Sequence, residues 1–325
     1  MTSKHEPAKH FLTGGAGFIG SHLLDHLLAQ GEKVTVYDNL SSGRRAWIQH
    51  NLDKDGFRFI QADLLDSDSL EQAMAGHDLV WHLGANTDIP AGRQDVDLDI
   101  KNCTLATHNL LEAMRTHGIS KLIFSSTSAL YGDPPVFPAP ESAGPLRPIS
   151  LYGAAKLACE GLISAYCHLF DIQAWMFRFA NVVGARMSHG VIFDFIQKLK
   201  RNPHELEIWG DGQGQKPFFL VEDCIEGIFC AYGKTDEWCD VFNLGTTTAT
   251  RIHNVAAIVI EEMGLAGVDL KYTGGRRGFP GDVPELLLDA SKMKLLGWQA
   301  SHTSDEAVRI AARRLLGKEA GLKVG

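Results

Sequence analysis

The first 180 residues alternate short apolar runs with segments of helical periodicity, and this alternation restricts the fold more than any other feature. The apolar runs include HFLT, KVTVY, LVWH and KLIF, and helical patterns such as FIGSHLLDHLLAQG and LYGAAKLACEGLISAYCHLF lie between or after them. Strands that alternate with helices of about ten or more residues are typical of βαβ units. We therefore expect an α/β fold with a doubly wound parallel sheet.

A glycine-rich stretch, TGGAGFIGSH, joins the first apolar run to the first helical segment. It contains the pattern Gly15-x-Gly17-x-x-Gly20. Glycines at this spacing let the backbone turn tightly and approach a pyrophosphate, which the positive end of the following helix attracts. In this context the pattern indicates a Rossmann-type dinucleotide site at the amino end of the chain.

Acidic residues follow the second and third apolar runs. Asp38 ends VTVYD, where a carboxylate accepts hydrogen bonds from the ribose 2′-hydroxyl and repels a 2′-phosphate, so it favours NAD over NADP. Arg44 and Arg45 lie nearby and could instead accept that phosphate. Asp63 is a candidate contact at the adenine end, although ADLLD could equally be a turn.

A run of hydroxyl residues, SSTSALYG, ends the KLIF strand, and LYGAAK follows about twenty residues later. Tyr152 and Lys156 are four residues apart on a helical segment and share one face. A neighbouring ammonium and an oxidised nicotinamide would lower the pKa of a phenol toward working pH. Thr127 or Ser126, at the carboxyl end of its strand, could hydrogen-bond the substrate hydroxyl that Tyr152 deprotonates.

The bulk composition limits the compartment and the partners. The 325 residues carry a net charge of −8, so nucleic acid is not an expected partner. We expect no signal peptide in the polar start and no membrane-spanning run. The six cysteines form no CxxC pair, no metal site is apparent, and free thiols in a reducing cytoplasm fit best.

The chain resembles the extended short-chain dehydrogenase/reductases, specifically the NAD-dependent nucleotide-sugar epimerase/dehydratase family. The matching pieces run in order over nearly the whole chain: TGGAGFIGSH, VYDNLSSG, DLLD, WHLGA, NLLEA, SSTSALYG, LYGAAKLACE, RFANVVG, VED and GDVPELLLDASKMKLLGW. The resemblance implies an NAD-binding Rossmann domain at 1–180 with a return segment near 217–245. It implies a smaller mixed α/β substrate lobe from 181–216 and 246–325.

The resemblance also implies the site residues. Thr127, Tyr152 and Lys156 would be catalytic, with hydride passing to and from tightly bound NAD. NAD contacts would come from Gly14, Gly17, Phe18, Ile19, Gly20, Asp38, Asn39, Ser42, Gly43, Asp63, Leu64, Leu83, Ala85, Asn102, Ser125, Tyr152 and Lys156. Contacts to a nucleotide sugar, most simply a UDP-sugar, would come from Ser126, Thr127, Asn181, His189, Val191, Lys216, Arg276 and Arg277.

The two residues after Thr127 indicate the branch of the family. Dehydratases place an acidic pair there, whereas this chain has Ser128 and Ala129, which disfavours 4,6-dehydration. A 4-epimerase resembling those of UDP-glucose and UDP-galactose is the leading hypothesis. A 4-dehydrogenase, a C3/C5 epimerase or a 4,6-dehydratase of the same fold is the alternative, and a non-catalytic NAD-binding subunit is a third.

The sequence leaves two features of the substrate lobe open. Lys216 stands where many relatives have arginine, and the resemblance implies that either Arg276 or Arg277 would supply the second diphosphate contact. The resemblance further implies a homodimer, in which helices near 101–117 and 152–170 form a four-helix bundle. Cys159 and Cys167 are expected near that seam.

Overall fold

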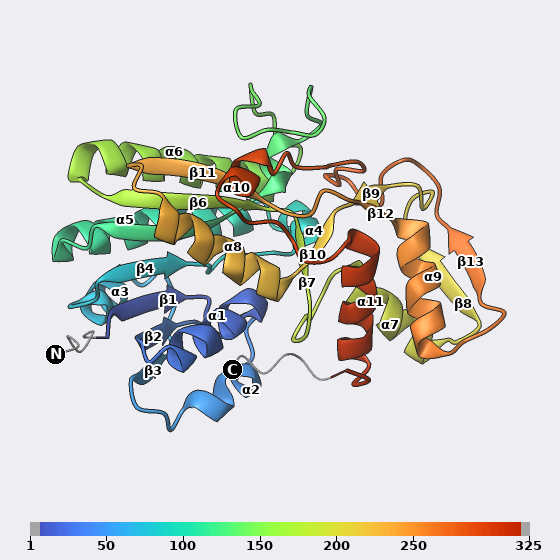
Figure 1. The fold of residues 1–325 in the computed structure, drawn as a ribbon, viewed down its shortest axis with the longest axis horizontal. Coiled ribbons are helices and arrows are strands. Elements are labelled where there is room, and N and C mark those ends of the chain that lie inside the picture. The colour runs from blue at the N-terminus through green and yellow to red at the C-terminus, as the bar shows by residue number, and fades with distance from the viewer. Residues whose placement is uncertain (1–6, 320–325) are drawn as a thin grey trace.

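The computed structural model describes residues 7–319. Residues 1–6 of the polar start therefore lie outside the described residues. The centre of the structure is a parallel sheet of seven strands in the order β11-β6-β5-β4-β1-β2-β3 (Figure 1). The strands are β1 (Lys9–Thr13), β2 (Lys33–Tyr37), β3 (Phe57–Ile60), β4 (Leu79–His82), β5 (Lys121–Thr127), β6 (Gln173–Phe179) and β11 (Cys239–Leu244). The predicted doubly wound α/β sheet is confirmed.

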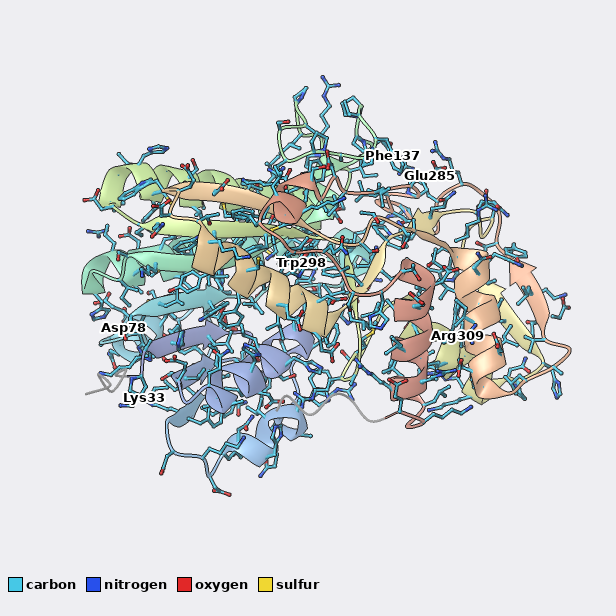
Figure 2. The ribbon with its side chains drawn as sticks, in the orientation of Figure 1. Lys33, Asp78, Phe137, Glu285, Trp298 and Arg309 are labelled. Carbon is cyan, nitrogen blue, oxygen red and sulfur yellow. The ribbon has the colours of Figure 1, made fainter. Side chains whose placement is uncertain are left out.

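Two layers of helices cover the two faces of the sheet, and successive side chains of each strand point alternately to one layer and the other. Phe11, Val80 and Phe124 face the layer that contains α3 (Ser67–Met74), α5 (Ala106–His117) and α6 (Leu151–Phe170). Leu12, Trp81 and Ile123 face the layer that contains α1 (Phe18–Ala29) and α8 (Val221–Lys234). Because both faces of the inner strands are buried, these strands read as continuous apolar runs, which is the pattern the sequence shows. Figure 2 shows side chains filling the space between the sheet and these helices.

The order of the sheet reverses between β1 and β4. The chain runs outward from β1 through β2 to β3, then returns and runs the other way through β4, β5 and β6. Parallel sheets bind ligands at the carboxyl ends of the strands beside such a switch point. The ends of β1, β4 and β5 are therefore the place to look for a site.

A smaller lobe carries its own core. It contains α7 (Val191–Arg201), α9 (Ile252–Met263) and α11 (Ser304–Leu315), with β8 (Glu205–Ile208) paired to β13 (Asp269–Tyr272). Two further pairs, β7 (Asn181–Val183) with β10 (Phe218–Leu220) and β9 (Gln215–Lys216) with β12 (Thr250–Arg251), lie between this core and the large sheet (Figure 1).

The structure bears on the predicted segments in two ways. β11 joins the large sheet beside β6, as a return segment requires. The segment QAWMFRFANVVG forms two strands, because after Ala180 the chain leaves the large sheet and β7 pairs with β10. The domain boundaries at 180, 217 and 245 stay a prediction.

Remaining elements connect these layers. They are α2 (Arg45–Ile48), η1 (Gln49–Asn51), α4 (Ile89–Gln94), a π-helix η2 (Ile100–Leu105), a 3₁₀ turn η3 (Ser128–Tyr131) and α10 (Ser291–Leu295). The proline-rich stretch 133–148 projects from the molecule and carries exposed Phe137 (Figures 1 and 2). No helix within residues 7–319 is long and apolar enough to span a membrane.

Candidate active site

The turn between β1 and α1 is built so that only glycine fits. Gly14 has φ +69°, and a Cβ there would lie 2.7 Å from the Gly84 nitrogen, at the end of β4. A Cβ on Gly20 would lie 2.1 Å from the Gly14 carbonyl oxygen. These contacts bring the start of α1 onto the switch point of the sheet.

This turn suits a pyrophosphate. The N-cap of α1 is Gly17, no side chain caps the helix, and its first turn holds no acidic residue. The first amides of the helix, at Phe18, Ile19 and Gly20, therefore present a positive helix end without a competing carboxylate. The residues predicted to hold a dinucleotide fit that group.

The acid predicted to bind ribose lies beside the same turn. Asp38 follows β2 and is 8% exposed. Its carboxylate accepts hydrogen bonds from the backbone nitrogens of Ala16 at 2.9 Å and Leu40 at 2.8 Å. Burial raises the pKa of this carboxyl, and the two backbone hydrogen bonds oppose that rise. The carboxylate is thus fixed next to the glycine turn, where a ribose hydroxyl would reach it.

The other predicted NAD contacts lie around the glycine turn or next to the strands β2, β3 and β4. Asn39 donates to Asp63 at 2.9 Å, and Asp63 also accepts from the Leu65 nitrogen, so it closes the turn after β3. A Cβ on Gly43, next to Ser42, would lie 3.0 Å from Ala16, and one on Gly84, between Leu83 and Ala85, would meet Leu64 at 2.9 Å. Asn102, in η2, donates to the carbonyl of Leu98, which precedes that helix. These residues stay predicted contacts.

The three predicted catalytic residues come from two adjacent elements. Thr127 ends β5, and Tyr152 and Lys156 lie in the first turns of α6, whose N-cap is Ser150. Tyr152 shares a hydrogen bond with Thr127. Lys156, 2% exposed, donates to the Ser125 carbonyl oxygen at 2.7 Å and lies 4.6 Å from the centre of the Phe124 ring. The structure therefore brings all three residues together at the sheet edge.

The electrostatics of Tyr152 differ from the expectation in one respect. Desolvation raises the pKa of its hydroxyl above the usual phenol value, and the hydrogen bond with Thr127 opposes this rise. The ammonium of Lys156 donates to the Ser125 carbonyl oxygen and makes no hydrogen bond to the Tyr152 phenol in the described structure. The predicted lowering of this pKa is therefore not a property of the protein alone, and the positive charge of oxidised nicotinamide would have to supply most of it.

Ser126, predicted to contact the substrate, is engaged elsewhere. Side chains alternate along β5, and Ser126 donates its hydroxyl at 2.5 Å to Glu160, which lies further along α6. Ser125 donates to the His82 carbonyl at 3.2 Å. A substrate contact from Ser126 stays a prediction, and the hydrogen bond to Glu160 gives it no support.

The predicted diphosphate cations lie at the junction with the smaller lobe. Lys216 pairs with Asp282 at 2.6 Å, and Arg277 pairs with Asp133 at 2.6 Å and donates to the Asp282 carbonyl oxygen. Arg276, in contrast, is 70% exposed and only approaches Glu285, at 3.5 Å. Of the two arginines, Arg277 is the one placed between the lobes.

The other predicted substrate residues lie around the start of the lobe. Asn181 begins β7 and donates to the Pro217 carbonyl at 3.4 Å, and His189 precedes Val191, the first residue of α7, by two positions. Nearby, a cavity of about 320 Å³ lies between α4 and the loop that follows Arg277, and it is lined by Pro90, Arg93, Gln94, Phe279 and Pro280. The cavity shows that the junction is hollowed beside Arg277.

Sequence reasoning missed a set of buried polar residues behind the site. His82 is 1% exposed and hydrogen-bonds Thr13 at 2.8 Å and Thr107 at 3.0 Å. Glu160 and Arg178 form a buried ion pair. A signal for the pair was present, because Glu160 follows Lys156 by four residues and Arg178 interrupts the apolar run MFRF. For His82 the apolar strand LVWH gave no sign of its partners.

Comparison with known proteins agrees with this geometry. Residues 10–245 match the model of the NAD dependent epimerase/dehydratase family. The chain is 32% identical over 304 residues to a putative UDP-glucose 4-epimerase of Methanocaldococcus jannaschii, covering 92% of this chain and 95% of the relative. The chain belongs to the NAD-dependent epimerase/dehydratase family, which confirms the predicted family, enzyme class and cofactor.

Solved structures extend the comparison over almost the whole chain. A crystal structure of a UDP-galactose 4-epimerase is 37% identical with a TM-score of 0.84, and 95% of this chain and 99% of that chain are covered. A UDP-glucose 4-epimerase of Thermus thermophilus, in complex with NAD, is 31% identical with a TM-score of 0.85 over the same shares.

Proposed function

We propose that the protein is a nucleotide-sugar 4-epimerase that acts on UDP-sugars. The observation that carries the proposal is the grouping of Thr127, Tyr152 and Lys156 at the sheet edge, followed by the non-acidic pair Ser128 and Ala129. Relatives and structural neighbours named UDP-glucose or UDP-galactose 4-epimerase support the substrate class. The acidic pair that elimination would need is absent from these two positions.

The chain's own residues account for the proton and charge movements. Tyr152 would take the proton of the sugar 4-hydroxyl and later return it, while Thr127 hydrogen-bonds the same oxygen. Lys156, held by the Ser125 carbonyl one helical turn beyond Tyr152, would add positive charge to the site, and oxidised nicotinamide would supply most of the charge that favours the ionised phenol. NAD, when bound, supplies reversible acceptance of hydride from C4. Between the two hydride transfers the 4-keto sugar would rotate in the site and present its other face, so the returned hydride inverts C4.

For the diphosphate we propose Lys216 and Arg277. Both cations point to the junction of the lobes, where carboxylates and a backbone carbonyl now hold them. A diphosphate would replace Asp133 and Asp282 as the acceptors of these donors. Arginine binds two oxygens at once, whereas lysine acts as a point charge, so Arg277 would fix the orientation.

Proton NMR of the purified protein with NAD and a panel of UDP-, GDP-, dTDP- and CDP-sugars tests the function. We expect a C4-epimer signal with a UDP-sugar and none with Tyr152→Phe. Tyr166→Phe, on the same helix but bonded to Glu112, is the matched control and should keep wild-type activity. A 6-deoxy-4-keto product, or no inversion with any sugar, would contradict the proposal.

We also propose a homodimer built on α5 and α6, in a reducing cytoplasm. Exposed apolar side chains on η2 and α6 support the dimer: Ile100, Leu105, Leu169 and Phe170. Cys159 and Cys167, predicted near this seam, are 0% exposed and belong to the core beneath α6, so their thiols would not be part of the contact surface. All six cysteines are free, which supports the reducing compartment.

A further inference from the structure

A buried network of polar side chains lies directly behind the catalytic residues. Glu160 in α6 and Arg178 in β6 form an ion pair with side chains only 7% and 6% exposed. The guanidinium binds both carboxylate oxygens, at 3.1 and 2.8 Å, and Ser126 donates to one of them at 2.5 Å. With Tyr131 and Asn243 these residues are called the buried network below.

One end of the buried network touches both catalytic elements. Glu160 lies one helical turn beyond Lys156 and two beyond Tyr152, on the same face of α6. Ser126 immediately precedes Thr127 in β5. The hydrogen bond between Ser126 and Glu160 therefore joins the strand end that carries Thr127 to the helix that carries Tyr152.

The other end reaches the loops that lead to the smaller lobe. Arg178 donates at 2.9 Å to the Tyr131 hydroxyl, which donates in turn at 2.8 Å to the side chain of Asn243. The Asn243 amide donates to the carbonyl oxygens of Ala139, in the proline-rich loop, and of Asp289. An unbroken chain of hydrogen bonds thus runs from α6 to the segment that returns from the smaller lobe.

Stability alone does not explain this arrangement. The desolvation of two buried charges offsets much of their attraction, and apolar residues of similar volume often replace such pairs without loss of stability. A bidentate, fully bonded pair does fix the relative position of the elements that carry it. The pair itself joins α6 to β6, and the hydrogen bond from Ser126 ties Glu160 to β5. Together these contacts fix the position of Thr127, at the end of β5, relative to Tyr152 on α6.

We propose that Glu160 and Arg178 are positioning residues for the reaction. They hold the Thr127 end of β5 against the Tyr152 face of α6, and through Tyr131 and Asn243 they align both with the loops that border the substrate junction. The inference rests on the proposed function for its kinetic test, but its structural part does not depend on which sugar is turned over.

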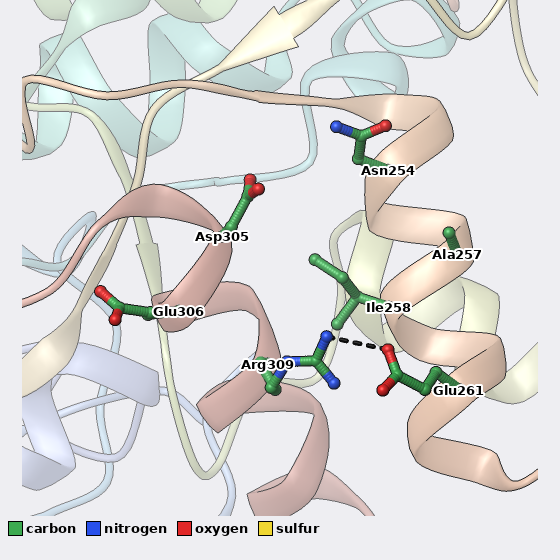
Figure 3. A pocket seen from close by; sticks show the side chains of 7 residues that line it. All are labelled: Asn254, Ala257, Ile258, Glu261, Asp305, Glu306 and Arg309. Carbon is green, nitrogen blue, oxygen red and sulfur yellow. Dashed lines mark hydrogen bonds and ion pairs between the residues drawn. The ribbon is translucent and has the colours of Figure 1, made fainter.

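The decisive variant replaces the pair with apolar residues, Glu160→Leu with Arg178→Met. We expect an unfolding midpoint close to that of the wild type, kcat lowered about 10- to 100-fold, and KM changed less than about twofold, because a misplaced catalytic group costs rate and not binding. The control is the pair Glu262→Leu with Arg309→Met between α9 and α11, where Arg309 bonds Glu262 at 2.6 Å. Figure 3 shows the second partner of Arg309, Glu261, in the same region. The control pair should keep wild-type kcat.

Two single variants keep the test sharp if the apolar pair folds poorly. Arg178→Lys retains the charge but loses the bidentate geometry, and Ser126→Ala removes only the link from β5 to Glu160. Each should lower kcat about 3- to 30-fold. A rise of KM with unchanged kcat in Ser126→Ala would instead show that this serine contacts the substrate, and it would contradict the positioning role proposed for it in the buried network.

Hydrogen–deuterium exchange of the protein alone gives a readout that needs no activity. In the apolar double variant, amides at 122–131 and 139–143 should exchange faster than in the wild type, and those of α9 and α11 should not change. Unchanged exchange together with wild-type kcat, or loss of stability and activity in proportion, would show that the pair is merely structural. If the wild type inverts no sugar, the proposed function fails, and the exchange result alone decides this inference.

Discussion

Arg276 and Arg277 are adjacent in sequence but differ completely in surroundings. Arg277 bonds Asp133 and the Asp282 carbonyl at the junction of the lobes, whereas Arg276 is 70% exposed at the rim. We expect Arg277→Ala to raise KM for a UDP-sugar about tenfold, because it loses a charge-assisted contact to the diphosphate. Arg276→Ala, its neighbour and control, should change KM less than about twofold. Steady-state kinetics that give equal effects would contradict the assignment.

His82 gives a pH-dependent contribution to stability. Burial lowers its pKa to about 3, and Lys156 adds to this effect. In the unfolded chain the imidazole binds a proton near its ordinary pKa of about 6.5, so as pH falls below that value the unfolded state gains a proton that the folded state does not. Stability is therefore intact above about pH 6.5 and is lost as pH falls toward 3.

The test compares the wild type with His82→Gln, whose amide can still bond Thr13 and Thr107. Urea unfolding between about pH 4 and 6.5 should show that the free energy of unfolding of the wild type falls with decreasing pH more steeply than that of the variant. The difference should approach about 1.4 kcal/mol per pH unit, the value for one proton. Parallel slopes would show that His82 is protonated in the folded protein.

At the scale of elements, the β1–α1 turn depends on contacts between backbones. A Cβ on Gly20 would lie 2.1 Å from the Gly14 carbonyl, and neither backbone can yield without moving α1 off the sheet. We expect Gly20→Ala to lower the melting temperature and to abolish the rise that NAD produces in the wild type, measured by thermal shift. Gly233→Ala in α8, where a Cβ meets nothing within 4 Å, is the control and should not destabilise the protein.

The same scale shows what the sequence could and could not predict. The inner strands β1, β2, β4, β5 and β6 could be predicted because both faces of each are buried, so each appears as an apolar run. The pairs β7–β10 and β9–β12 were not, because strands of two or three residues carry no period and pair with partners at least 34 residues away. The sequence could not predict that Ser126 bonds Glu160 instead of a substrate. It also could not predict that Lys216 pairs with Asp282, because the two residues are 66 positions apart in the chain.

At the scale of the whole molecule, the apolar residues left on η2 and α6 require an explanation. Ile100, Leu105, Leu169 and Phe170 are 57%, 45%, 70% and 42% exposed, and they lie on the layer of helices that covers one face of the sheet. Singly exposed leucines are common on protein surfaces and need no partner, but several on adjoining helices of one layer favour a buried interface. A second copy of the same chain would bury them around a two-fold axis.

We therefore expect light scattering to give about twice the 35.6 kDa of one chain. Leu105→Glu should shift this mass toward the monomer, because each dimer would bury two carboxylates next to apolar side chains. Leu295→Glu is the matched control, since Leu295 is 89% exposed on α10, outside the proposed interface, and this variant should remain dimeric. A wild-type mass of one chain would rule out the dimer, and a dimer that survives Leu105→Glu would place the interface on another surface.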